Sequence, residues 1–338
     1  MNRPNLFEIA TSELSQDAFI AWLLKWSNKQ YKKDNEKLHN CAIEFTQKLI
    51  NKNIKIEKIE VGRQLKNIDV WAIVNDKYFI IIEDKKRTKE HSNQLLRYKE
   101  YIKANYNDKK YEIFPVYFKM EEQSNFNNVK KAGYTIFDRE KMLSIISKYN
   151  DCNDILSDYI IYLKNLEEAV NSYKNKLITD WYWYSWFGFF SKLQDELQNG
   201  NWGYVPNRSG GFIGFWWNWH SAKIDNIEFY FYLQLEYDKL IIKIKNTNNN
   251  SKSDIKKVRS KLRDILYEVS KKEEKFKFKN YGRIGKWMGI SKLNSDYRIV
   301  DKNNLINIDK TIKNLKVFED LLLNIKEKID LLPQKMSK

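Results

Sequence analysis

The chain has 338 residues, of which 42% are hydrophobic and 15% aromatic, so it can bury a large core, and its length predicts two domains. Its formal net charge of +16 favours a polyanionic partner, because each phosphate that a protein neutralises releases condensed counterions. The two cysteines and three histidines lack metal-ligand spacing, which argues against a disulfide framework, a zinc site or a histidine-based triad. The sequence has no apolar signal core and no apolar segment of membrane-spanning length, so we expect a cytoplasmic protein whose chemistry relies on carboxylates and lysines.

The first half of the chain alternates helical and strand patterns in the order expected for a mixed sheet flanked by helices. The expected helices lie at residues 12–28, 39–51, 91–106, 139–149 and 154–173, and the expected strands at 56–63, 67–75, 77–85, 112–120 and 133–138. Ser12 or Ser15 is the expected N-cap of the first helix, and the Asn75–Asp76 pair predicts a tight hairpin. We therefore predict that residues 1–175 form an α/β domain.

The second half of the chain, residues 176–338, contains most of the tryptophans and is predicted to form a separate α+β domain with antiparallel strands. The expected strands lie at 210–219, 227–237 and 239–245, and the expected helices at 253–270 and 310–332. The aromatics in FWWNW and FYFYLQL either build a sheet core or offer surfaces on which bases stack. The basic segments KKVRSKLR and KFKFKNYGR leave two roles open, nucleic-acid binding and recognition of a partner protein.

Acidic and basic residues stand side by side where the apolar strand YFIII ends, in EDKKR. Residues two apart on a strand point to the same face, so Glu83 and Lys85 share one face and Asp84 takes the other. A hairpin folded at 75–76 places Asp69 roughly level with Glu83 on the neighbouring strand. Two adjacent carboxylates repel each other unless a cation lies between them, and their oxygens suit Mg²⁺. Lys85 could then orient or deprotonate a water molecule, or stabilise charge at phosphorus.

This arrangement resembles the PD-(D/E)XK nuclease superfamily, whose signature is an acid on one strand and a (D/E)-x-K triplet on the next. Asp69 matches the first acid, and residues 83–85 match the triplet. Gln94 and Tyr98 in NQLLRY match a Q-x-x-x-Y pattern on the following helix, as in a restriction-endonuclease-like bacterial branch with E-x-K followed by Q-L-L-R-Y. Glu13 matches the first-helix glutamate that joins the metal site in many members. The likeness covers residues 1 to about 150, although no proline precedes Asp69 and Asp84 adds an acid inside the triplet.

The resemblance implies a nuclease that depends on Mg²⁺, with Mn²⁺ as a substitute. Its metal ligands would be Asp69, Glu83 and Glu13, and its catalytic residues Asp69, Glu83, Lys85 and Gln94. A metal-activated water would attack the phosphodiester bond, and the expected substrate is DNA, cut internally. The resemblance also implies a role in defence or DNA processing, with a homodimer or a defence-system protein as a possible assembly.

The basic residues beside the triplet are candidates for contacts with nucleic acid. This set consists of Lys86, Arg87, Lys89, Arg97 and Tyr98. Charge runs are also typical of solvated faces, and an acid in the first turn of a helix, as at Glu13, stabilises the helix dipole without any catalytic role. The alternative function is a nucleic-acid-binding or protein-interaction module that keeps the nuclease fold and does not cut.

Overall fold

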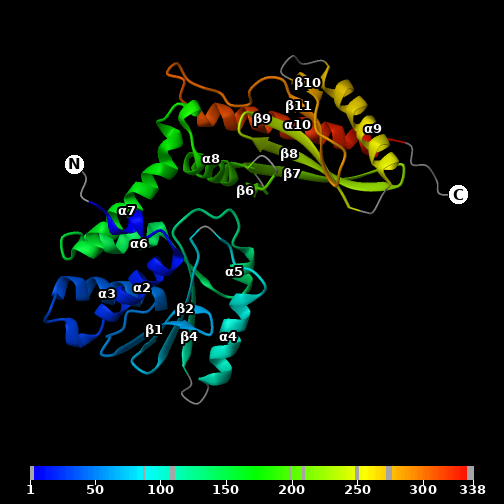
Figure 1. The fold of residues 1–338 in the computed structure, drawn as a ribbon. Coiled ribbons are helices and arrows are strands. Elements are labelled where there is room, and N and C mark those ends of the chain that lie inside the picture. Colours follow the sequence, from blue (N-terminus) through cyan, green and yellow to red (C-terminus); the bar gives the residue numbers. More distant parts are fainter. Residues whose placement is uncertain are drawn as a thin grey trace. The chain divides into compact units, whose positions relative to one another are not determined.

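The computed structural model describes residues 4–86, 88–106, 111–197, 199–207, 210–247, 251–271 and 276–332. The chain divides into two units, Met1–Glu168 and Ala169–Lys338, each with its own sheet (Figure 1). The assignment of separate functions to residues 1–175 and 176–338 stays a prediction. Within the described residues, no helix is long and apolar enough to cross a lipid bilayer.

The sheet of the first unit has five strands in the order β1-β2-β3-β4-β5. The strands are β1 (Ile59–Leu65), β2 (Ile68–Val74), β3 (Tyr78–Asp84), β4 (Glu112–Lys119) and β5 (Thr135–Asp138). The first three are antiparallel, whereas β3, β4 and β5 are parallel, which confirms the predicted mixed sheet. Asn75 and Asp76 both have positive φ, as the predicted tight hairpin between β2 and β3 requires.

Helices cover both faces of this sheet (Figure 1). They are α1 (Leu6–Ile9), α2 (Glu13–Trp26), α3 (Glu36–Ile50), α4 (Gln94–Asn105), α5 (Asn127–Lys131), α6 (Arg139–Ile146) and α7 (Asp154–Asn171), the last of which crosses the boundary between the units. Ile80 and Ile82 of β3 pack with α2, α3 and α6, and Phe79 and Ile81 pack with α4 and α5. The whole of β3 is therefore buried, which explains its uninterrupted apolar sequence.

The sheet of the second unit has six antiparallel strands in the order β10-β11-β9-β8-β7-β6. The elements are α8 (Trp183–Glu196), β6 (Asn201–Val205), β7 (Phe212–Ile224), β8 (Ile227–Glu236), β9 (Lys239–Asn246), α9 (Lys252–Ser270), β10 (Phe278–Asn280), β11 (Trp287–Leu293) and α10 (Ile308–Asp330). The predicted strands at β7, β8 and β9 and both predicted helices are confirmed. The segment WYWYSWFGFF forms the end of the preceding loop and most of α8.

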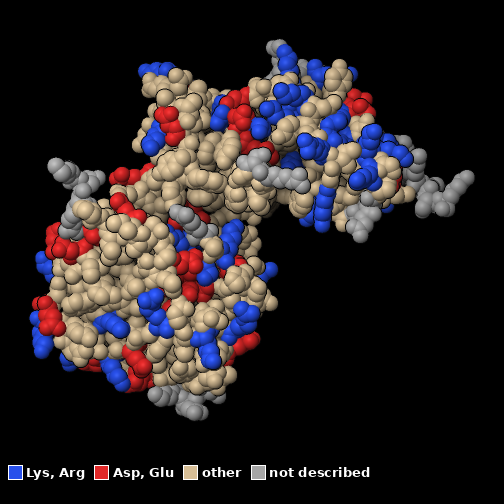
Figure 2. All heavy atoms as spheres, viewed as in Figure 1, with Lys and Arg blue, Asp and Glu red and all other residues tan. Residues whose placement is uncertain are grey.

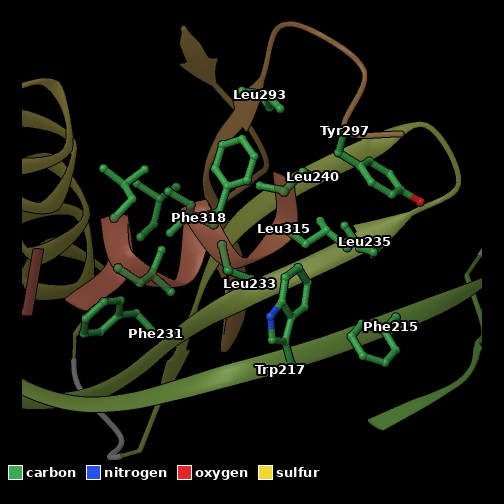
Figure 3. Packing of buried hydrophobic residues seen from close by; sticks show 14 of the residues in the cluster. Phe215, Trp217, Phe231, Leu233, Leu235, Leu240, Leu293, Tyr297, Leu315 and Phe318 are labelled. Atoms are coloured by element: carbon green, nitrogen blue, oxygen red, sulfur yellow. The ribbon is translucent and has the colours of Figure 1, made fainter. Parts of the chain in front are cut away.

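The core of this second unit lies between the sheet and its helices. Phe215 and Trp217 from β7 and Leu233 from β8 point toward Leu315 and Phe318 of α10 (Figure 3). The pairing register of β7 shifts between Trp217 and His220, and Asn218 within the shift has a φ of 54°. Part of the aromatic content therefore builds the core, as one of the two predicted alternatives required.

Trp217→Ala should lower the free energy of unfolding of the second unit by about 3–5 kcal/mol, since it leaves a large cavity. It also removes the donor of the 2.8 Å hydrogen bond to Glu319 Oε1. Urea unfolding followed by circular dichroism measures the loss. Tyr267→Ala on α9, whose side chain is 70% exposed, is the control and should change stability by no more than about 0.5 kcal/mol. Equal losses in both variants would contradict the assigned core.

Candidate functional site

The adjacent ends of β2 and β3 bring Asp69, Glu83 and Lys85 together. Val70 pairs with Ile82, so Asp69 and Glu83 occupy the next position along the same ladder. Lys85 forms an ion pair with Glu83, and its Nζ lies 3.7 Å from Asp69 Oδ2. The same Nζ donates to the backbone oxygen of residue 84 at 3.1 Å. The positive charge of Lys85 therefore offsets part of the repulsion between the two carboxylates that strand pairing brings together.

Glu83 is the most buried member of this group, with only 1% of its surface exposed. Its Oε1 accepts a hydrogen bond from Gln94 Nε2, at the first turn of α4, and contacts Lys85 Nζ. Burial raises the pKa of Glu83 to about 8, and neighbouring Asp69 adds to the shift although Lys85 opposes it. Its second oxygen, Oε2, is buried and accepts no hydrogen bond from the described residues, although the Asp69 carboxyl group lies within hydrogen-bonding reach of Glu83. Glu83 is therefore an acid that needs a further cation to ionise fully.

The pKa values of Asp69 and Lys85 are also shifted by burial and by neighbouring groups. Burial raises the pKa of Asp69, while Lys85 and the backbone N–H of Asp84 lower it; that N–H donates to Asp69 Oδ2 at 2.9 Å. Burial alone would lower the pKa of Lys85, but Glu83 and Asp69 outweigh this effect and raise it to about 12. Lys85 is consequently protonated at neutral pH.

The donor set fits a hard divalent cation at Asp69 and Glu83. Mg²⁺ binds through one or two carboxylates together with substrate phosphate, and the unpartnered Glu83 Oε2 is an oxygen of the required kind. Nowhere in the described part of the chain do three or more His, Cys, Asp or Glu residues form a group that could hold a metal ion. A ligand set that also includes Glu13 therefore stays a prediction.

Glu13 lies at the first position of α2, after its N-cap Ser12, and binds the segment that follows β3. Its Oε1 accepts hydrogen bonds from the Lys86 backbone N–H at 2.9 Å and from Thr88 Oγ1 at 3.0 Å. The buried Lys119 binds the same segment, because its Nζ donates to the backbone oxygens of Lys86 at 2.8 Å and Thr88 at 2.9 Å. Burial lowers the pKa of Lys119 to about 8. These contacts hold the chain where it leaves the site.

A second pair of acids, Asp17 and Asp84, lies on the α2 side of β3. Gln16 Nε2 donates to Asp84 Oδ1 at 2.6 Å, and each acid has one buried oxygen that accepts no hydrogen bond from the described residues. The two carboxyl groups lie within hydrogen-bonding reach of each other. Burial raises the pKa of Asp17 to about 7, with a further contribution from Asp69, and burial and Asp17 raise the pKa of Asp84 well above its usual value. The Asp17–Asp84 pair is therefore more stable with a proton on one of its carboxyl groups than with both ionised.

Three residues of this site were missed in the sequence: Gln16, Asp17 and Lys119. Glu13, Gln16 and Asp17 are spaced i, i+3 and i+4, so they share one face of α2, and this spacing was the signal that could have revealed them. Lys119 offers no comparable signal, because only the parallel pairing of β3 with β4 brings it to the segment after Lys85.

Comparison with known proteins decides the family. Residues 4–181, more than half of the chain, match the profile of the PD-(D/E)XK nuclease superfamily. The chain belongs to this superfamily. No curated protein and no solved structure gives a significant match. Membership in the superfamily agrees with the five-stranded mixed sheet and its flanking helices, and it makes a nucleic acid the expected class of substrate.

The residues of this superfamily member that are predicted to contact nucleic acid differ in how deeply they are buried. Lys86 is buried, and its Nζ lies 5.0 Å from the centre of the Tyr162 ring. Lys89 and Arg97 are exposed, whereas Arg87 lies outside the described residues. Tyr98 is buried, and this burial, together with the charges of Glu83 and Asp69, raises its pKa. Contact of these five residues with nucleic acid stays a prediction.

Asp17→Asn should change how stability depends on pH. The pKa of Asp17 is about 7 in the folded protein and near 3.8 when unfolded. Between these pH values the folded protein therefore holds a proton on this carboxyl group that the unfolded chain has released. Stability from this group is therefore complete below about pH 4 and is lost as the pH rises to 7. We expect Asp17→Asn to lose less stability than the wild type between pH 5 and pH 8, measured by urea unfolding in EDTA.

Asp76→Asn is the matched control, because Asp76 is an exposed carboxylate that contacts Lys58 in the hairpin. Its pH profile should run parallel to that of the wild type. A profile of Asp17→Asn that also runs parallel to the wild type would contradict a proton held by the Asp17–Asp84 pair.

Proposed function

We propose that this protein is a divalent-metal-dependent nuclease that hydrolyses phosphodiester bonds within DNA. The observation that carries the proposal is the convergence of Asp69, Glu83 and Lys85 at the end of β3, with Glu83 Oε2 buried and unpartnered among the described residues. A binding module would gain nothing from two buried carboxylates facing the phosphates of its ligand. Membership in the PD-(D/E)XK superfamily supports the same conclusion.

Asp69 and Glu83 would hold the metal, with Mg²⁺ as the expected ion and Mn²⁺ as a substitute. When bound, such an ion lowers the pKa of water and neutralises charge at the phosphate. Gln94 donates to Glu83 Oε1 and so fixes the carboxylate with Oε2 available for binding. The hydrogen bonds that Glu13 accepts from Lys86 and Thr88 both go to Oε1, so Glu13 would contribute to the ion through Oε2 and keep these contacts.

Lys85 acts as a cation in this proposal rather than as a base. In the metal-free site Glu83 and Asp69 raise the pKa of Lys85 to about 12, so its ammonium is protonated at neutral pH before an ion binds. It can therefore donate hydrogen bonds to a scissile phosphate or to a water molecule, and it stabilises negative charge that develops at phosphorus. The proposal therefore keeps two of the roles expected from the sequence, orienting a water molecule and stabilising charge at phosphorus, and sets aside deprotonation of the water.

The net charge of +16 supports a nucleic-acid substrate, and exposed Lys89 and Arg97 near the site would contact its backbone. We place the activity in defence or DNA processing within the cytoplasm. Cutting of both strands would be served by a homodimer or by a partner protein of a defence system.

Asp69→Asn and Glu83→Gln should each reduce cleavage on the order of 100-fold or more, because each removes a charge that the metal requires. The assay incubates the full chain with supercoiled plasmid and with linear DNA, in Mg²⁺, in Mn²⁺ and in EDTA. Conversion of the closed plasmid identifies an endonuclease. Lys85→Met should reduce the cleavage rate while metal binding is kept.

Asp76→Asn serves as the control for loss of a carboxylate and should cut like the wild type. Cleavage that continues unchanged in both Asp69→Asn and Glu83→Gln would refute the assigned site. If no condition gives cleavage and Glu83→Gln strengthens DNA binding, the protein is the non-cutting module instead.

A further inference from the structure

The second sheet has an aromatic pocket on the face opposite its core. Its volume is about 380 Å³, within the range of small-ligand sites. Strands β6, β7, β8, β9 and β11 contribute its lining residues, which are Val205, Trp216, Trp219, Tyr232, Gln234, Lys243 and Trp287. Trp216 and Trp219 flank the core residue Trp217, so the register shift in β7 distributes three neighbouring tryptophans between the two faces.

The aromatic pocket combines one stacked pair of rings with a third ring that is nearly perpendicular to both. Trp219 stacks on Tyr232 with ring centres 3.9 Å apart and an interplanar angle of 13°. Trp287 stands nearly perpendicular to both, with its ring centre 6.3 Å from each of theirs. Trp287 is 49% exposed, although burying a tryptophan is among the largest apolar contributions to a core. The pocket therefore presents flat apolar surfaces to solvent, as a stacking ligand requires.

Two lysines, Lys243 and Lys245, lie next to these rings. Lys243 lines the pocket directly opposite Tyr232 in the β8–β9 ladder, and among the described residues no carboxylate lies within ion-pair distance of it. Burial lowers the pKa of Lys243, although Glu236 opposes the shift. Lys245 Nζ lies 4.8 Å from the centre of the Trp287 ring. The site thus combines aromatic faces with positive charge that has no close counter-ion in the pocket.

The combination of aromatic rings and lysines favours some classes of ligand over others. A quaternary ammonium ligand, which aromatic cages often bind, would be repelled by Lys243 and Lys245. A purely apolar ligand would bury the Lys243 ammonium without a partner, at a large cost in free energy. A nucleobase with its phosphate satisfies both features, because the base stacks on the rings and the phosphate pairs with a lysine.

The charge of the surrounding unit favours the same class of ligand. Figure 2 shows Lys and Arg gathered over the part of the second unit that contains α9, β10 and β11. Exposed lysines on α9, which packs on the core face of the sheet and therefore not on the face of the pocket, contribute to this charge at longer range, namely Lys252, Lys256, Lys257 and Lys261. A polyanion is attracted to such a surface over about a Debye length.

We propose that the aromatic pocket binds a base of single-stranded nucleic acid, with Trp219 and Trp287 as stacking surfaces and Lys243 as the phosphate contact. Bases in a duplex are already stacked and paired, so they do not reach such a pocket without first being unstacked. The lining residues of this pocket all belong to the second unit, and its binding does not depend on cleavage.

The test measures binding of a fluorescein-labelled 20-nucleotide single strand to the full chain by anisotropy in EDTA, so that no cutting occurs. DNA and RNA strands are compared with a duplex of the same sequence. We expect the single strand to bind more tightly than the duplex and to quench tryptophan fluorescence. Trp287→Ala and Trp219→Ala should each weaken binding about 10-fold, and Lys243→Met should weaken it and reduce its dependence on salt.

Matched controls separate this effect from misfolding and from general charge. Trp287→Phe should keep most of the affinity, because a ring remains. Tyr267→Ala removes an exposed aromatic from α9, and Lys257→Met removes an exposed lysine from it; the first should leave binding unchanged and the second should lower it less than Lys243→Met. Thermal unfolding verifies that each variant folds.

Three outcomes would overturn the proposal. The first is wild-type affinity in Trp219→Ala, Trp287→Ala and Lys243→Met together. The second is equal affinity for a free mononucleotide and for the 20-nucleotide strand, which would make the pocket a nucleotide site. The third is loss of single-strand binding in Glu83→Gln but not in Trp287→Ala, which would assign the binding to the first unit. Retained single-strand binding in a protein that never cuts would refute the nuclease function and leave this proposal standing.

Discussion

Burial of the Glu83 carboxyl group at the end of a fully covered strand is the constraint on which the first unit depends. An ionised carboxylate in such a place is costly, so its surroundings must supply positive charge and hydrogen bonds. Lys85 supplies the charge, and Gln94, the first residue of α4, supplies the hydrogen bond. Even so, one oxygen of Glu83 has no hydrogen-bond partner among the described residues. In the proposed function, a divalent cation would complete this compensation.

The alternation of side chains along β3 places two acids one residue apart in different chemical environments. Glu83 faces α4 and Lys85, where a cation can complete its environment. Asp84 faces α2, where Gln16 and a second acid surround it and a retained proton is the more favourable solution. The extra acid inside the E-x-K triplet thus belongs to the packing of α2 on the sheet. It links the end of β3 to the same helix that carries Glu13.

The second unit uses aromatic side chains in two ways on one sheet. Phe215 and Trp217 fill the core against α10, whereas Trp219 and Trp287 lie on the opposite face among lysines. A regular strand would alternate strictly, but the register shift after Trp217 changes which residues share a face. The two alternatives that the sequence offered for these aromatics, a core or a stacking surface, therefore apply to different members of the same strand.

The sequence by itself determined the mixed sheet, the hairpin at Asn75–Asp76 and the alignment of Asp69 with Glu83, because strand periodicity and turn preferences act over a few residues. It also separated the faces of Glu83 and Asp84 for the same reason. Only the tertiary structure decided that Asp17 and Gln16 surround Asp84 and that Lys119 binds the segment after Lys85. It also decided which of the neighbouring tryptophans lie in the core and which line the pocket. Those contacts join residues that are distant in sequence, or they depend on a local register shift. Their energies come from burial and packing, which no local pattern encodes.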